Sequence, residues 1–62
     1  MTDVIDIPNE LAEMLSQNGN ARAAFEKLSP SHRNEYARWV SEAKRQETRV
    51  RRARKTLDML LQ

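Results

Sequence analysis

The chain has 62 residues, no cysteine, one glycine and a formal net charge of +2 at pH 7. This length suits one small domain, and the lack of cysteine excludes a disulfide framework and a thiolate metal site. No apolar run is long enough for a membrane span or a signal peptide, and the start of the chain is acidic, so we expect a cytoplasmic protein.

Punctuation and apolar spacing predict four helices, over residues 8–18, 21–28, 30–44 and 47–61. Pro8 suits the first position of the first helix, because proline lacks an N–H that would have no partner there. Asn18-Gly19 is expected to end this helix with a residue that tolerates positive φ. Asn20 is the expected cap of the second helix.

Ser29-Pro30 is the clearest helix start in the chain, since the serine oxygen can accept from free amides while proline fixes φ. Glu47 suits the first turn of the last helix, which would bury a seam of Val50, Ala53, Leu57 and Leu60. No segment shows the period-2 alternation of a strand. The predicted fold class is therefore all-α, a single domain with a small bundle of about four helices.

The charge is divided unevenly along the chain. Residues 1–31 carry five acids and two bases, a net charge of −3, whereas residues 32–62 carry nine bases and four acids, a net charge of +5. Between Lys44 and Lys55, seven cations accompany one acid. Charge polarised in this way indicates an anionic partner, either a nucleic acid or an acidic protein surface, unless it is simply the solvated face of a helix.

On the last helix, Arg51, Arg54 and Lys55 should form one outward stripe, with Arg45 and Arg52 at its flanks. Such a stripe can contact successive phosphates, and its composition suits contact with a nucleic-acid backbone better than readout of bases. The nucleic-acid interpretation rests on Arg45, Arg51, Arg54 and Lys55.

His32 is the single histidine, and a catalytic interpretation would pair it with Glu35. No serine, cysteine or second histidine stands at a spacing that would make it a general base toward a nucleophile. One histidine with scattered carboxylates does not make a zinc site. We expect a structural hydrogen bond for His32, and predict no catalytic residue, no metal and no cofactor.

Several unrelated residue types recur at fixed spacing in the second half of the chain. They are the Ser-Pro-Ser-His-Arg opening at residues 29–33, the Glu-Tyr…Trp spacing of residues 35–39, and an Ala-Lys-Arg-x-Glu-Thr-Arg-x-x-Arg segment at residues 43–52. Together with a helical lead-in from Ile7, they resemble the YdeI/OmpD-associated (OmdA) family, often labelled bacteriocin protection. The resemblance extends from about Ile7 to Leu61.

This resemblance implies an all-α fold found in bacterial proteins of poorly defined function, and it carries over no catalytic residues. Two departures stand out. Gln46 occupies a position where many members carry proline, and the additional N-terminal domain of many members is missing, so we expect the helical module standing alone. The polar members of the family's recurring positions form the candidate binding surface: His32, Arg33, Lys44, Arg49 and Arg52.

The preferred interpretation is a non-enzymatic binding or interaction module whose partner is a protein, with an acidic surface, or an attached domain. It predicts a small concave patch near the His32 turn and the start of the last helix. Nucleic-acid binding is the alternative. Because Met59, Leu60 and Leu61 cannot all face one narrow seam, some apolar surface should be exposed near the C-terminus, which leaves a homodimer open.

Overall fold

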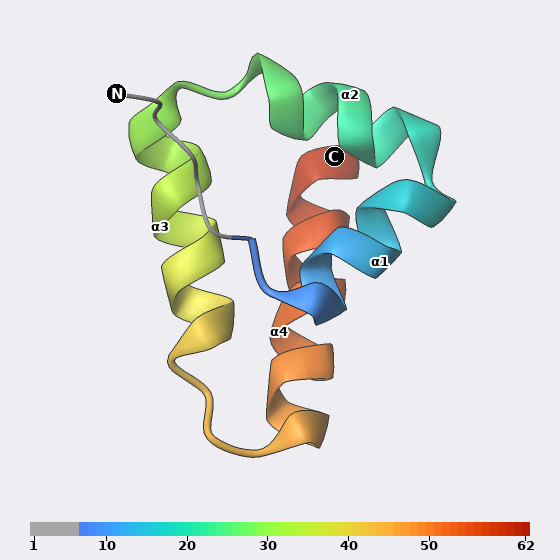
Figure 1. The fold of residues 1–62 in the computed structure, drawn as a ribbon. Coiled ribbons are helices and arrows are strands. Elements are labelled where there is room, and N and C mark those ends of the chain that lie inside the picture. Colours follow the sequence, from blue (N-terminus) through green and yellow to red (C-terminus); the bar gives the residue numbers. More distant parts are fainter. Residues whose placement is uncertain (1–6) are drawn as a thin grey trace.

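A computed structural model describes residues 7–62, which form four helices and no strand. The helices are α1 (Asn9–Gln17), α2 (Gly19–Lys27), α3 (Pro30–Ser41) and α4 (Gln46–Leu61). They make one body with a radius of gyration of 10.8 Å (Figure 1). The predicted all-α, single-domain fold is confirmed.

The longest helix, α4, is the common packing partner of the other three. α1, α2 and α3 each pack against it, and α1 also packs against α2. Figure 1 shows α3 and α4 as neighbouring antiparallel helices, joined at one end by residues 42–45. The first turn of α3 therefore lies at the opposite end of this pair from the first turn of α4.

The core is small and draws on all four helices. Its buried apolar residues are Leu11 and Leu15 of α1, Ala21 and Phe25 of α2, Val40 of α3 and Ala53 of α4. Tyr36 and Trp39 pack against this cluster but stay half-buried. Both residues therefore contribute to the core and remain partly accessible to solvent.

The junction between α1 and α2 differs from the prediction. Asn18 adopts an extended conformation with φ −134°, and its side chain accepts a hydrogen bond of 3.1 Å from the Ala21 amide. The expected cap at Asn20 and the expected positive φ are therefore wrong: no described residue has positive φ, and Gly19 is the first residue of α2. One asparagine both ends α1 and caps α2, so the connection needs no left-handed residue.

The start of α1 also differs by one residue. Pro8 has ψ 148°, which is extended, and its carbonyl accepts a 2.9 Å hydrogen bond from the Ala12 amide. It is thus the residue before the helix, and Asn9 takes the first helical position that we predicted for Pro8.

The start of α3 is as predicted, whereas its end comes three residues early. Ser29 Oγ accepts from the His32 amide at 3.3 Å and Pro30 opens the helix. At the other end, the Ala43 amide bonds the Val40 carbonyl at 3.3 Å, which tightens the last turn and lets the chain leave at Glu42. Arg45 then precedes α4 in an extended conformation, without a side-chain cap.

One core position has no apolar side chain. Thr56 of α4 is fully buried, and its hydroxyl donates to the Arg52 carbonyl at 2.9 Å. The predicted seam of α4 omitted this residue because threonine does not register in an apolar pattern. The bond to the preceding turn satisfies the hydroxyl and allows the methyl group to pack.

Candidate functional site

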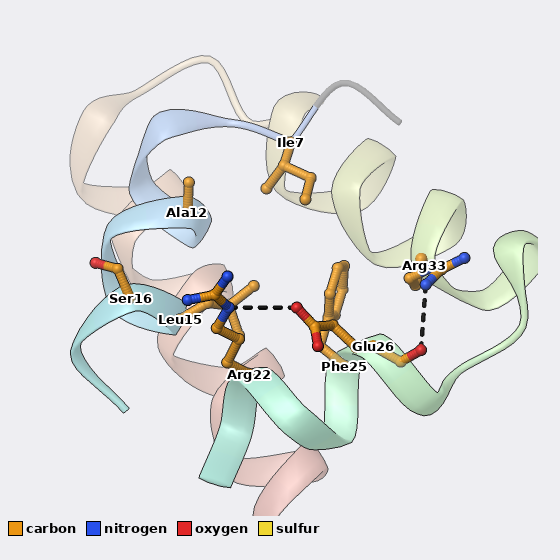
Figure 2. A pocket seen from close by; sticks show the side chains of 8 residues that line it. All are labelled: Ile7, Ala12, Leu15, Ser16, Arg22, Phe25, Glu26 and Arg33. Atoms are coloured by element: carbon orange, nitrogen blue, oxygen red, sulfur yellow. Dashed lines mark hydrogen bonds and ion pairs between the residues drawn. The ribbon is translucent and has the colours of Figure 1, made fainter. Parts of the chain in front are cut away.

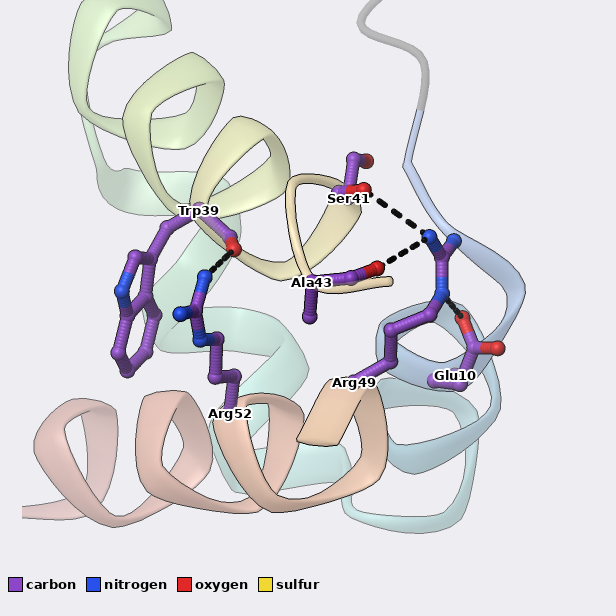
Figure 3. Close-up of polar contacts among 6 residues, drawn as sticks. All are labelled: Glu10, Trp39, Ser41, Ala43, Arg49 and Arg52. Carbon is purple, nitrogen blue, oxygen red and sulfur yellow. Dashed lines mark hydrogen bonds and ion pairs between the residues drawn. The ribbon is translucent and has the colours of Figure 1, made fainter. Parts of the chain in front are cut away.

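Arg49, in the first turn of α4, joins three segments of the chain. Its Nη1 donates to the Ser41 carbonyl at 3.0 Å and to the Ala43 carbonyl at 3.3 Å, and its Nε lies 3.2 Å from Oε1 of Glu10 (Figure 3). The two carbonyls belong to the end of α3 and the loop that follows it, where helical donors are missing. The guanidinium therefore fastens the α3–α4 loop and the start of α1 to α4.

Glu10 is the acidic partner in this arrangement, and the accessible fraction of its side chain is 11%. The pKa of Glu10 is lowered from its usual 4.5, chiefly by a backbone hydrogen bond at Glu10 itself and further by Arg49 and Gln46, although burial acts in the opposite direction. The sequence did not point to Glu10, because nothing in its spacing links it to a residue 39 positions later.

Arg52, one turn further along α4, contacts Trp39 of α3 twice. Its Nη1 donates to the Trp39 carbonyl at 2.7 Å, and its Cζ lies 5.2 Å from the centroid of the Trp39 ring (Figure 3). A guanidinium over an indole face is a favourable cation–π arrangement. Arg52 thus connects the two antiparallel helices instead of facing solvent.

The five residues of the predicted binding surface do not come together in one patch. His32 and Arg33 lie in the first turn of α3, whereas Lys44 and Arg49 lie at the other end of the α3–α4 pair (Figure 1). His32 is exposed and its Nδ1 lies 3.0 Å from Ser29 Oγ, so the ring shares a hydrogen bond at the helix start. Lys44 is exposed in the loop.

Arg33 faces a hollow of about 580 Å³ between α1, α2 and α3 (Figure 2). Its Nη1 donates to the Glu26 carbonyl at 3.2 Å, while Nε is buried without a hydrogen-bond partner. Across the hollow, Arg22 pairs with the Glu26 carboxylate at 3.3 Å. Apart from Arg33 Nε, these polar groups are bonded within the protein, and Leu15 and Phe25 complete the lining of the hollow.

The outward side of α4 carries cationic side chains that are exposed to solvent and can contact a partner. Arg51, Arg54 and Lys55 are all exposed, as the periodicity of the helix predicted, and no ion pair within residues 7–62 involves them. Two exposed acids, Glu47 and Asp58, stand four residues before Arg51 and four residues after Arg54, so they share this side of the helix. We call these five residues the α4 outer face. Arg45, the fourth residue of the nucleic-acid interpretation, is exposed just before the helix.

A second hollow, of about 340 Å³, lies between α3 and α4. We call it the α3–α4 hollow; its lining residues are Glu35, Tyr36, Trp39, Lys55 and Met59. Met59 is 39% exposed, and Leu61 nearby is 47% exposed, so the predicted exposure of apolar surface near the C-terminus is confirmed. Tyr36 and Trp39, which pack against the core, therefore also line a surface depression that the sequence analysis did not predict. The sequence signal for it is one α4 methionine outside the apolar seam.

The described residues contain neither a metal-binding cluster nor a membrane-spanning helix. Residues 7–62 hold no group of three or more His, Asp or Glu side chains placed to bind a metal ion. In the same part of the chain, every helix is too short or too polar to cross a lipid bilayer.

Comparison with protein-family models shows which family the chain belongs to. The family model described as "Bacteriocin-protection, YdeI or OmpD-Associated" matches residues 4–62. The chain has no significant match among curated proteins and none among solved structures. Because the family model covers nearly the whole chain, including the Ser29–Arg33 and Ala43–Arg52 motifs, the chain belongs to the bacteriocin-protection, YdeI/OmpD-associated family.

Proposed function

We propose that this chain is a non-enzymatic interaction module that binds an acidic surface of another protein through the α4 outer face. The observation that carries the proposal is a contrast between neighbouring arginines. Arg49 and Arg52 are bonded inside the fold, whereas Arg51 and Arg54 are exposed and belong to no ion pair within residues 7–62. Exposed cations held on a rigid helix can meet carboxylates without first giving up an internal partner.

The proposal is consistent with the family to which the chain belongs. The family's description supports a role related to bacteriocin protection at the level of the family. A protein-binding module fits such a role, since protection can act through complex formation without chemistry on a substrate.

A protein partner suits this face better than a nucleic acid does. Glu47 and Asp58 lie on the same side of α4 as the three cations, so a phosphate backbone laid along the helix would meet two carboxylates. A protein surface can place its own charges to match this alternation, and the outcome is selectivity for one pattern of charges.

The non-enzymatic part of the proposal is supported by the surroundings of His32. Its ring shares a hydrogen bond with Ser29 Oγ at the start of α3, and it lies on the exposed side of the helix. This is the arrangement of a capping contact, in which the ring supports the serine that caps the helix.

The test is capture of partners from the native bacterium at low salt by the immobilised chain and by two variants. Arg51→Glu/Arg54→Glu reverses two charges of the α4 outer face. Lys27→Glu/Arg38→Glu makes the same change in net charge with exposed cations of α2 and α3. We expect the wild-type chain and the control variant to retain the same acidic protein, and the α4 variant to lose it.

Salt-titrated binding to duplex DNA and to RNA completes the test. We expect the α4 variant and the control variant to bind duplex DNA and RNA equally weakly. If duplex DNA or RNA binds tightly at low salt and the α4 variant alone loses it, the nucleic-acid alternative replaces this proposal. Equal capture of the protein partner by all three chains would also overturn it.

A further inference from the structure

We infer that the α3–α4 hollow is the docking site for a second copy of this chain, which forms a dimer with two-fold symmetry. This inference concerns the hollow between the helices. The hollow shares Lys55 with the α4 outer face, but the inference does not rest on the partner proposed for that face. It rests on the apolar lining of the hollow, on the fixed position of its tryptophan and on the two charges at its rim.

The lining of the hollow is suited to contact with another protein surface. Tyr36 and Trp39 of α3 line the hollow and are half-buried, and Met59 of α4 is 39% exposed. Aromatic residues and methionine are enriched where proteins associate. Covering this apolar depression removes apolar surface from water, which favours association.

The hollow also has a defined shape before any partner arrives. Arg52 covers the Trp39 ring at 5.2 Å and bonds the carbonyl of the same residue at 2.7 Å. These contacts fix the indole relative to α4, so binding costs little ordering of this side chain.

The two charges at the rim favour a second copy as the occupant. Glu35 comes from α3 and Lys55 from α4, so they stand on opposite sides of the hollow, and they form no ion pair with each other. A two-fold axis running along the hollow, parallel to the helices, brings α3 of one copy opposite α4 of the other. Glu35 of each copy then faces Lys55 of the other, and both contacts are attractive. A partner of uniformly acidic or basic surface would meet one like charge here.

The experiment measures molar mass by sedimentation equilibrium of the purified chain up to ~1 mM, since a small interface of this kind gives a weak dimer. Four samples are compared with the wild-type chain: Glu35→Lys alone, Lys55→Glu alone, an equimolar mixture of these two variants, and the control Lys27→Glu. All the substituted side chains are exposed, and circular dichroism verifies that each variant is folded.

We expect the mass of the wild type and of the control to rise from 7.2 kDa toward twice that value with concentration. Each single variant should stay at 7.2 kDa, because both of its rim contacts become repulsive. The equimolar mixture should associate again, since the two variants restore both attractive contacts across the interface. A wild-type chain that stays at 7.2 kDa throughout overturns the inference. A mixture that associates no more than its components overturns it as well.

Discussion

Arg52 holds Trp39 at both its backbone and its ring. One guanidinium nitrogen donates to the Trp39 carbonyl at 2.7 Å, and the guanidinium carbon lies 5.2 Å from the ring centroid. Both contacts join α4 to α3. Because the planar guanidinium can bond in its plane and stack through its face, a single side chain makes two different interactions.

Replacing Arg52 should therefore weaken the fold more than replacing a neighbouring arginine. We expect Arg52→Ala to lower the free energy of unfolding by about 2–3 kcal/mol, from one charged hydrogen bond and one cation–π contact. Arg52→Lys should recover only part of this loss. Urea unfolding followed by circular dichroism measures the change. Arg54→Ala is the control, with an expected effect below about 0.5 kcal/mol, because Arg54 is exposed. Equal losses for the two alanine variants would contradict the assignment.

The contacts of Glu10 predict a stability difference that depends on pH. The pKa of Glu10 is lowered in the folded chain from its usual 4.5. The folded state therefore binds a proton less readily than the unfolded state, and the contribution of Glu10 to stability is fully present above pH 4.5. It is lost as the pH falls below 4.5 and through the lowered pKa.

The variant Glu10→Gln removes this titration. We expect it to be less stable than the wild type at neutral pH, with a difference that narrows as the pH falls below 4.5. Urea midpoints of both chains across the acid range give the comparison. Glu13→Gln, which removes an exposed carboxylate from the same helix, serves as the control for the loss of one charge and should have nearly the stability of the wild type at neutral pH. A Glu10→Gln difference that is the same at all pH values would argue against the ionised contact.

The Asn18–Gly19 junction predicts changes of opposite sign at adjacent residues. Gly19 is helical, has no positive φ, and a Cβ at this position would meet no atom within 4 Å. Gly19→Ala should therefore raise the free energy of unfolding by about 0.4–1 kcal/mol. Asn18→Ala removes the cap on Ala21 and should lower it by about 1 kcal/mol. Thermal unfolding of both variants and of Asn20→Ala, the residue first expected to cap α2, separates the two assignments. A larger loss of stability for Asn20→Ala than for Asn18→Ala would assign the cap of α2 to Asn20 instead.

Because the core is small, a cavity in it should remove a large part of the free energy of unfolding. Leu11 is fully buried at the centre of the cluster, and Leu11→Ala should cost about 2–5 kcal/mol. Since a core of this size supplies only about 3–5 kcal/mol, a large fraction of this variant should be unfolded at room temperature. Leu61→Ala offers a matched comparison, because Leu61 is 47% exposed, and should melt within a few degrees of the wild type. Loss of the helical circular dichroism signal for the first variant alone is the expected result.

Features that depend on adjacent residues could be predicted from the sequence. Ser29 and Pro30 start α3 as expected, because a cap and a fixed φ act within one turn of the chain. The α1–α2 junction is equally local, but Asn18 and Asn20 both suit a cap. The local sequence does not decide between them; in the structure Asn18 accepts from the Ala21 amide, and Asn20 lies exposed within α2.

The fate of individual arginines could be predicted only for one side of α4. Periodicity placed Arg51 and Arg54 outward, and both are exposed. Periodicity could not predict that Arg49 and Arg52 bond within the fold. Their partners, Glu10 and Trp39, lie on other helices, and these contacts depend on how the helices pack. The five residues of the predicted binding surface lie apart on α3, on α4 and in the loop between them. Residues that recur in a sequence motif need not form one surface, because each can have a different partner.

Trp39 is the chain's single tryptophan, and Arg52 covers its ring at the joint between α3 and α4. Its intrinsic fluorescence therefore reports on that joint without an attached dye. Separation of α3 from α4 would remove the guanidinium from the indole and change the emission. Comparing the emission with the helical signal during unfolding would show whether this pair of helices opens together with the rest of the domain or before it.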